Sequence, residues 1–251
     1  MKLVSYISSL IIGASLILVF EPFNFWFLTF FIPLSLYFLI KDHDIKSSFY
    51  LGWFFGFGLW LIGIFWIENS IYFYGGATKS VSYFLVICLS AFLALLNGIF
   101  FGIFAYCKTK TNFDILFLFP SIWVGSEWIR EFLLSGFPWF YLGYTSLDNF
   151  FFSGFIPIFG VFGMSFILIF IPALIFVLGE SLISGRQKKI SLIYLTIFSL
   201  FLIASFSSYK VEWTTKKDEV NIVIIQPNIS IEEKWSFQGE NESINLFKSC
   251  L

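Results

Sequence analysis

Charged residues are scarce in this chain. Asp, Glu, Lys and Arg together make up 12% of the 251 residues, whereas hydrophobic residues make up 58%. Soluble globular proteins contain about 25% charged residues and roughly 45–50% apolar residues. The composition therefore indicates an integral membrane protein.

The net charge is also small, and cysteines are few. A formal charge of −1 creates no field that would attract nucleic acid, so no nucleic-acid partner is predicted. Cys88 and Cys107 lie in one apolar stretch, about 28 Å apart if that stretch is helical, which excludes a disulfide between them. No motif for a metal or a cofactor is recognised, and none is predicted.

Long apolar runs dominate what remains. A membrane-spanning helix needs roughly 20 apolar residues. By this measure seven spans are predicted, at residues 3–20, 23–40, 48–67, 80–107, 113–134, 155–178 and 190–207. The second is interrupted by Pro33 and follows the first after only Glu21 and Pro22, so a re-entrant hairpin is the alternative. The first run has no signal-peptide cleavage site before Glu21 and is interpreted as a retained span.

Basic residues in the short connections predict the orientation, because they are enriched on the cytoplasmic side. A cytoplasmic N-terminus places eight basic residues inside and one, Lys79, in the outer connections before the last span. The eight are Lys2, Lys41, Lys46, Lys108, Lys110, Arg186, Lys188 and Lys189. Seven spans then deliver the chain after residue 207 to the outer, periplasmic side.

The character of the chain changes after Ser208. A polar stretch leads to VNIVIIQPNIS (220–230), a short β-branched run that predicts a buried strand. FQGENESINLF then predicts a helix start, with Asn241 as a possible cap. The expected domains are a helical bundle at 1–208 and the beginning of a soluble domain at 209–251, which is too short to bury a core of its own.

Three charges fall within the fifth predicted span. Glu127, Arg130 and Glu131 have helical spacing that places them on one face, and charges at membrane depth are costly. One interpretation is an internal ion pair that orients helices. The other is that Arg130 binds an anionic lipid head group, and Arg130 is therefore a candidate substrate-binding residue.

The third span is rich in glycine. Gly52, Gly56, Gly58 and Gly63 predict close approach of neighbouring helices. Glu68 and Asn69 follow at the outer edge. Glu68 is a second candidate for binding a polar substrate group, although a solvated loop residue is the alternative.

The segment SGFPWFYLGYTSLDN (135–149) is unusual for a connecting loop. Trp139, Tyr141 and Tyr144 fit an aromatic belt at the membrane interface. A belt does not require the Gly136-Phe137-Pro138 corner, however, in which proline fixes φ and glycine provides a hinge. The alternative is that this loop supports something on the outer face.

Five segments are distinctive when they are taken in order along the chain. They are FEPFNFW (20–26), GWFFGFGLWLIGIFWIENSI (52–71), PSIWVGSEWIREFLLSGFPWFYLGYTSLDN (120–149), PIFGVFGMSF (157–166) and VNIVIIQPNISIEEKW (220–235). The Gly-Phe-Pro-Trp loop and the Gln226–Trp235 segment are the most specific. Together they resemble apolipoprotein N-acyltransferases of Gram-negative bacteria, and the likeness covers nearly the whole chain.

The resemblance implies a multi-pass protein of the bacterial inner membrane, followed by an α/β nitrilase-like (αββα) domain on the periplasmic face. Such enzymes pass an acyl chain from a phospholipid donor through a Cys thiol to the α-amino group of a lipoprotein acceptor. Trp139 and Trp235 match positions near the mouth of the active site in this family.

The family's catalytic Glu, Lys and Cys are not assigned in this chain. Cys250 follows a predicted helix rather than a strand end, which argues against a nucleophile. The chain is therefore expected to be a truncated form that is inactive alone. The alternatives are a membrane scaffold or lipid-binding half that pairs with a separately encoded C-terminal half, or the product of a decayed gene. A small transporter is disfavoured because no repeated halves with broken helices are visible.

Overall fold

The structure is a computed structural model, and its described residues are 2–133, 136–147, 149, 151–184, 188–215, 217, 220–222, 224, 226, 228–229 and 236–250. The chain divides into two compact units, Met1–Val211 and Glu212–Leu251. Each unit is described by itself. Because Trp235 lies outside the described residues, its predicted role has no structural counterpart here.

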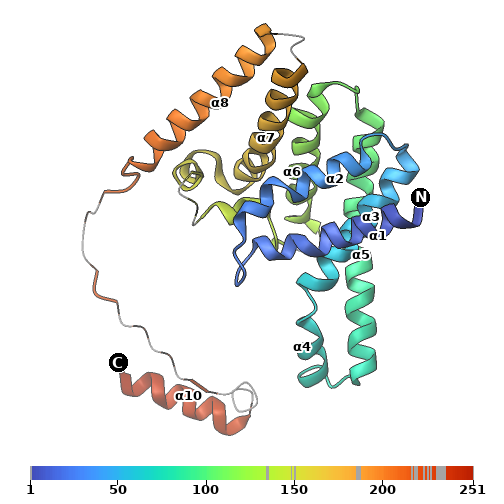
Figure 1. The fold of residues 1–251 in the computed structure, drawn as a ribbon. Helices are drawn as coiled ribbons and strands as arrows, with labels where there is room; N and C mark the ends of the chain where they lie inside the picture. Colours follow the sequence, from blue (N-terminus) through green and yellow to red (C-terminus); the bar gives the residue numbers. More distant parts are fainter. Residues whose placement is uncertain are drawn as a thin grey trace. The chain divides into compact units, whose positions relative to one another are not determined.

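All regular structure in the described part of the first unit is helical (Figure 1). In chain order the elements are α1 (Lys2–Ser15), η1 (Leu16–Val19), η2 (Trp26–Phe30), α2 (Ile32–Ile40), α3 (Ile45–Gly63), α4 (Ile67–Phe73), α5 (Lys79–Cys107), the π-helical η3 (Asp114–Leu118), α6 (Phe119–Arg130), η5 (Leu142–Ser146), η6 (Ser153–Phe155), α7 (Ile156–Ser184) and α8 (Lys188–Tyr209).

Four helical segments among the described residues are long and apolar enough to cross a membrane. They are Ile45–Gly63, Lys79–Cys107, Ser153–Ser184 and Ser191–Tyr209. These segments confirm the third, fourth, sixth and seventh predicted spans as membrane-length helices. The segment predicted as the fifth span is helical from η3 through α6 but shorter.

The first two predicted spans form shorter elements. Leu3–Val19 and Trp26–Ile40 are apolar, but both fall below the length of the four long helices. They are joined by a tight turn in which the amide of Phe25 donates to the carbonyl of Leu18 at 2.9 Å. The α-helical part of α2 has nine residues, about 14 Å at the helical rise, roughly half the hydrocarbon thickness. The count of seven spans therefore remains a prediction.

Glycines allow α1, α3 and α5 to pack closely, as the sequence predicts. A Cβ on Gly58 of α3 would overlap the backbone carbonyl of Leu10 in α1. On the next face of α3, a Cβ on Gly56 would lie 2.6 Å from Oδ1 of Asn97 in α5. Both contacts need the absence of a side chain, which is the usual way for membrane helices to approach one another.

Polar groups join the same helices inside the bundle. The indole of Trp60 on α3 donates to Oδ1 of Asn97 on α5 at 3.1 Å. The hydroxyl of Ser9 on α1 donates to the carbonyl of Leu51 on α3 at 2.6 Å. Hydrogen bonds between apolar helices add specificity to packing that would otherwise depend on shape alone.

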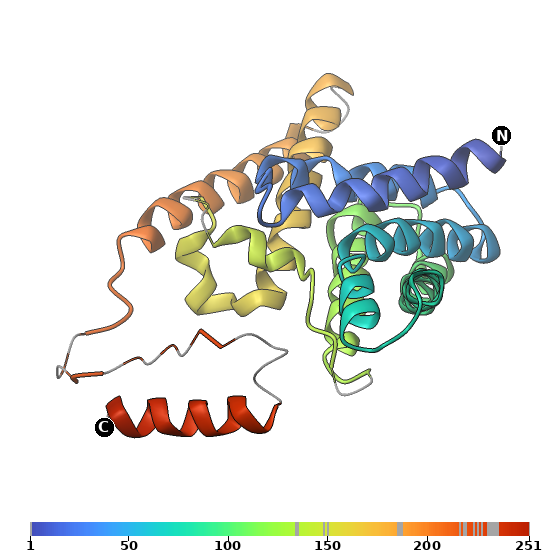
Figure 2. The same cartoon turned by 90° about the horizontal axis from the view of Figure 1, so that it is seen from below.

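The connection between α6 and α7 is a series of short turns that includes η5 and η6 (Figure 2). Both short helices pack against α7. Gly160 interrupts α7 near its start with a φ of 61°, a backbone conformation that glycine adopts without strain. These turns bring residues of the 136–147 segment to the end of α6.

The second unit contains one helix, α10 (Phe237–Cys250), among its described residues. The predicted helix start is confirmed, but Asn241 lies inside the helix rather than at its cap. Ser236 caps it instead, because its hydroxyl accepts the amide of Gly239 at 3.0 Å. The described residues of 220–230 form no strand, so that prediction is not confirmed. A strand needs a neighbouring strand to bond its backbone groups, and none is present in the described part.

Candidate functional site

Two charged side chains are buried at the end of α6. Glu127 is 1% exposed and Arg130 is 5% exposed. The third charge of the predicted set, Glu131, is exposed and forms the C-cap of the helix. The shared face predicted for the three is therefore wrong for Glu131, because the helix ends there and only the first two charges point inward.

Glu127 fixes the start of η5. Its Oε1 accepts the indole N–H of Trp123 and the backbone amide of Leu142, both at 2.9 Å. The next amide, that of Gly143, donates to Oγ of Ser165 on α7 at 2.8 Å. The first amides of a helix have no partner within the helix. Side chains from α6 and α7 supply those partners here, so η5 is held from two sides.

Arg130 fixes the preceding part of the loop. Its Nη1 donates to the carbonyl of Trp139 at 2.9 Å, and its Nε donates to the carbonyl of Ser126 at 3.3 Å. The guanidinium lies 4.9 Å from the ring centre of Trp60 and 5.0 Å from that of Tyr141. Guanidinium groups are attracted to such ring faces, most strongly away from water.

The internal ion pair predicted for this span is not a direct contact. Within the described chain the only ion pair closer than 4.0 Å joins Lys41 and Asp42. Arg130 is held by carbonyls and rings, while Glu127 is held by N–H donors. Its second oxygen, Oε2, is buried and has no partner among the described residues. The two charges stabilise one loop through separate contacts.

Tyr141 completes this arrangement from the loop side. It is 2% exposed, so it does not belong to an aromatic belt at the surface, whereas Tyr144 is 44% exposed. Burial raises the pKa of Tyr141, which keeps the phenol neutral. We name Trp60, Glu127, Arg130, Trp139 and Tyr141 the loop-anchoring cluster.

The backbone of the loop also indicates that surrounding contacts hold it in one conformation. Gly136 has a φ of 97° and Phe140 a φ of 57°. Gly136 thus adopts a positive φ that glycine reaches at little cost, and the hinge at this residue remains a prediction. A left-handed Phe140 is unfavourable because the residue has a Cβ. The ring of Phe140 is held 5.2 Å from that of Phe20 and 6.0 Å from that of Trp60. Surrounding contacts of this kind are what strained residues in functional loops require.

Trp139 connects the loop to α4, which carries Glu68. The ring of Trp139 lies 5.1 Å from that of Trp66, the residue that precedes α4. Glu68 is 4% exposed, and its Oε1 is buried without a hydrogen-bond partner in the described part of the chain. Its neighbour Asn69 is exposed. Arg130 and Trp139 are thus in contact, and Glu68 lies two positions from the residue that Trp139 packs against.

Two members of the cluster, Trp60 and Tyr141, were not assigned to it from the sequence. Trp60 and Tyr141 are separated from Arg130 along the chain, and nothing in their local sequence predicts that both rings lie about 5 Å from the guanidinium. Trp123 was detectable in principle, since it lies four positions before Glu127 on the same helical face.

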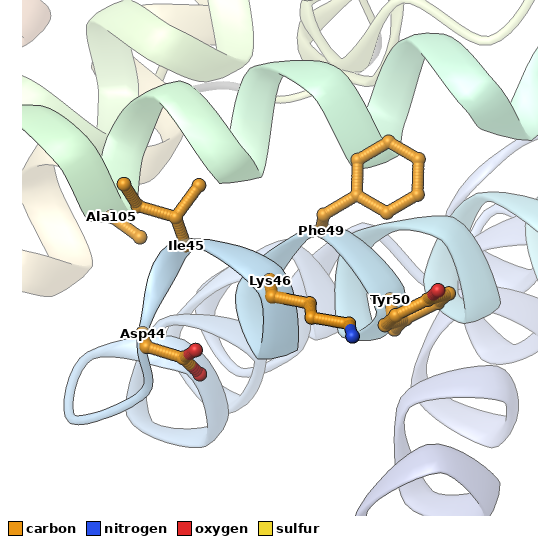
Figure 3. A pocket seen from close by; sticks show the side chains of 6 residues that line it. All are labelled: Asp44, Ile45, Lys46, Phe49, Tyr50 and Ala105. Carbon is orange, nitrogen blue, oxygen red and sulfur yellow. The ribbon is translucent and has the colours of Figure 1, made fainter.

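A separate hollow of about 610 Å³ lies at the start of α3 (Figure 3). Its lining residues are Asp44, Ile45, Lys46, Phe49, Tyr50 and Ala105. Ile45 and Phe49 project toward α5, while Lys46 extends along α3 toward Tyr50 (Figure 3). It contains none of the predicted site residues. Asp44 caps α3 by accepting the amide of Ser47 at 3.2 Å, and the hydrogen bonds from Ser47 lower its pKa.

The membrane-length helices and the buried charges define a class, the polytopic helical membrane proteins. Comparison with known families is more specific. Residues 12–174 match the apolipoprotein N-acyltransferase N-terminal domain, and the chain belongs to this family.

Curated relatives support the assignment. The apolipoprotein N-acyltransferase of Pasteurella multocida is 30% identical and aligns with 100% of this chain and 48% of its own length. That of Coxiella burnetii is 34% identical, with 90% of this chain and 46% of the relative covered. That of Haemophilus influenzae is 30% identical, with 93% and 44% covered. The chain thus spans a little under half the length of these relatives.

Proposed function

We propose that this chain forms the membrane part of an apolipoprotein N-acyltransferase, which transfers an acyl chain from a phospholipid to a lipoprotein. The family match over residues 12–174 is the observation that supports this proposal most strongly. Because the chain spans less than half the length of its relatives, we propose that residues 1–251 do not complete the transfer alone. A nucleophilic thiol and its base must then come from further polypeptide.

The proposed topology follows the bias of the basic residues. Seven spans with a cytoplasmic N-terminus would put the segment after residue 208 in the periplasm, where it would begin a nitrilase-like domain. The seven spans include the two short apolar segments, Leu3–Val19 and Trp26–Ile40. A reporter fused after residue 251 tests the topology, and cytoplasmic activity of that reporter would contradict it.

The loop-anchoring cluster and Glu68 are proposed to form the substrate-facing side of the membrane part. Trp139 would provide an apolar wall for the acyl chain, as an indole at an interface suits a ligand with a polar and an apolar end. Arg130 would act on the substrate through the carbonyl of Trp139 that it holds. The unpartnered oxygen of Glu68 would accept a hydrogen bond from a polar group of a substrate. Trp235 is proposed as a further contact.

Complementation tests the function. Cells depleted of their own apolipoprotein N-acyltransferase would express this chain alone, or together with the C-terminal half of the Pasteurella multocida relative. Mass spectrometry of a lipoprotein N-terminus measures the transfer. We expect N-acylation only in the second case. Acylation by the chain alone would contradict the need for further polypeptide, and no acylation in any pairing with a relative's C-terminal half would contradict the proposed function.

The same assay separates the proposed contacts from neutral positions. Glu68→Ala and Trp139→Ala are expected to lower the rate of transfer by about tenfold or more, since each removes a contact worth on the order of 1.4 kcal/mol in the transition state. Asn69→Ala is the matched control, because Asn69 is adjacent to Glu68 and exposed. Equal effects of Glu68→Ala and Asn69→Ala would contradict a specific role for Glu68.

A further inference from the structure

A small polar pocket of about 230 Å³ lies where α2 ends and η3 begins, against the last part of α7. It is distinct from the loop-anchoring cluster, because it adjoins the start of the η3–α6 segment and the cluster adjoins its end. Charged residues of both signs line it, among them Lys41, Asp42, Lys110 and Glu180. Pockets for drug-sized ligands are commonly about 300–1,000 Å³, so this space suits a small head group.

The two lysines come from different loops. Lys41 follows α2, and its Nζ lies 5.2 Å from the ring centre of Phe38 and 3.9 Å from Oδ2 of Asp42. The loop that carries Lys41 is itself held in place, because Nζ of Lys108 donates to the carbonyls of Lys41 and His43. Lys108 is thus occupied in fixing the loop.

Lys110 is held in an unusual conformation, with a φ of 61°. Asp114, which is 3% exposed, produces this turn. Its carboxylate accepts the amide and hydroxyl of Thr109 at 2.8 Å each and the amide of Lys110 at 2.6 Å. The bound carboxylate of Asp114 shapes the loop. A left-handed residue with a Cβ, over-determined by its surroundings, is a reason to suspect a functional site.

The pocket opens onto an apolar rim. Phe38 and Phe176 line it and pack with ring centres 4.8 Å apart. Both rings are also partly exposed, at 37% and 40%. The helix that carries Phe176, α7, is long enough to cross a membrane. The exposed rings therefore offer a surface on which an acyl chain can lie beside a charged head group.

We propose that this pocket binds a phospholipid whose head group carries both a phosphate and a primary ammonium, as in phosphatidylethanolamine. Lys41 and Lys110 would hold the phosphate, while Asp42 and Glu180 would accept the ammonium protons. The acyl chains would lie along Phe38 and Phe176. The two carboxylates disfavour a lipid with a purely anionic head group, and a methylated ammonium cannot donate the hydrogen bonds that they accept.

Native mass spectrometry of the full chain in detergent tests the proposal. The probes are phosphatidylethanolamine, phosphatidylcholine and phosphatidylglycerol with identical acyl chains, together with soluble glycerophosphoethanolamine. We expect phosphatidylethanolamine to be retained about fivefold more than either other lipid, in line with a few partly exposed charge contacts. We expect the soluble compound not to displace it at equal concentration.

Variants locate the binding. The double variant Lys41→Ala, Lys110→Ala is expected to lower retention of phosphatidylethanolamine by about fivefold, and Glu180→Gln is expected to remove its advantage over phosphatidylcholine. Lys46→Ala is the matched control, because Lys46 lies near the same end of the helices and does not line the pocket.

Three results would overturn the proposal. They are equal retention of the three lipids, unchanged retention in the double variant, and displacement by the soluble head group, which would assign the site to a free phosphate ester. None of these results measures acyl transfer, so the proposed function is tested independently by the complementation assay.

Discussion

The two ends of the η3–α6 segment use charge in opposite ways. At the C-terminal end of this segment, Glu127 and Arg130 are buried. Glu127 accepts hydrogen bonds from an indole and a backbone amide, and Arg130 donates to a backbone carbonyl and contacts two aromatic rings. Near its start, Lys110 is exposed beside a pocket, and only the shaping residue Asp114 is buried. Charges that are fully engaged hold a structure in place. Charges that remain accessible are available to a ligand.

This difference separates stability from binding. Removing a buried acceptor leaves its donors unpaired in an apolar environment, which costs far more than a hydrogen bond contributes in water. Removing an exposed charge changes stability little. Substitutions at the two ends should therefore differ sharply in their effect on unfolding.

The largest effect is expected for Glu127→Ala. The indole N–H of Trp123 and the amide of Leu142 would lose their acceptor, and the free energy of unfolding should fall by about 3 kcal/mol. Unfolding by SDS in mixed micelles, followed by tryptophan fluorescence, measures it. Glu131→Ala is the control and should change stability by less than about 0.5 kcal/mol. Similar losses for both variants would remove the distinction between buried and exposed charge.

Arg130→Lys should cost less, about 2 kcal/mol, because the positive charge remains while the planar contacts with Trp60 and Tyr141 are lost. Hydrogen exchange of the peptide covering 136–147 should become faster. Exchange in α8 serves as the internal reference and should not change. If the loop exchanged at the original rate, Arg130 would not be its anchor.

Gly58→Ala tests whether packing between helices, rather than charge, limits stability. A Cβ at this position would overlap the carbonyl of Leu10, so α1 and α3 must separate, and we expect a loss of about 1–2 kcal/mol. At Gly179 a Cβ meets nothing within 4 Å. Gly179→Ala should therefore be neutral or stabilising, since alanine favours a helix. The SDS titration compares the two variants directly.

The smallest effect is expected for the exposed Asp44 at the start of α3. Hydrogen bonds from Ser47 hold its pKa below the ordinary value of 3.8, so the folded state binds this proton less readily than the unfolded state. The stabilisation is complete above the unfolded pKa and is lost as the pH falls through the lower folded pKa. The difference in Tm between the chain and Asp44→Asn should thus shrink as the pH falls from above the unfolded pKa through the lower folded pKa. Because asparagine also caps helices, this comparison isolates the charge of Asp44, and a gap that persisted in strong acid would contradict the stabilising role of that charge.

Hydropathy was sufficient to predict where the long helices begin and end, because the thickness of the bilayer determines how long a membrane-spanning helix must be. The predicted spans at 80–107 and 190–207 differ from α5 and α8 by no more than two residues at each end. The same criterion overestimated the length of the second predicted span, 23–40, because the apolar helical segment there begins only at Trp26. Apolar composition does not reveal that residues 26–30 form a 3-10 turn rather than an α-helix, since the choice depends on contacts with the neighbouring η1.

The candidate site was only partly predictable. Spacing along one helix identified Glu127 and Arg130 as a pair, and the Gly-Phe-Pro-Trp corner identified the loop that they hold. The partners of Arg130 could not be found, because Trp60 reaches it from α3 and Tyr141 from beyond the corner. The strand predicted near residue 220 was suggested by β-branched composition, but composition cannot supply the second strand that pairing requires.

The π-helical turn at Asp114–Leu118 determines the direction in which each side chain of the following helix, α6, projects from the helix axis. A π-turn accommodates one extra residue relative to an α-helix, and one residue corresponds to about 100° of rotation around the axis. If this turn tightened into ordinary α-helix, the carboxylate and the guanidinium at the far end would rotate away from the groups they now hold.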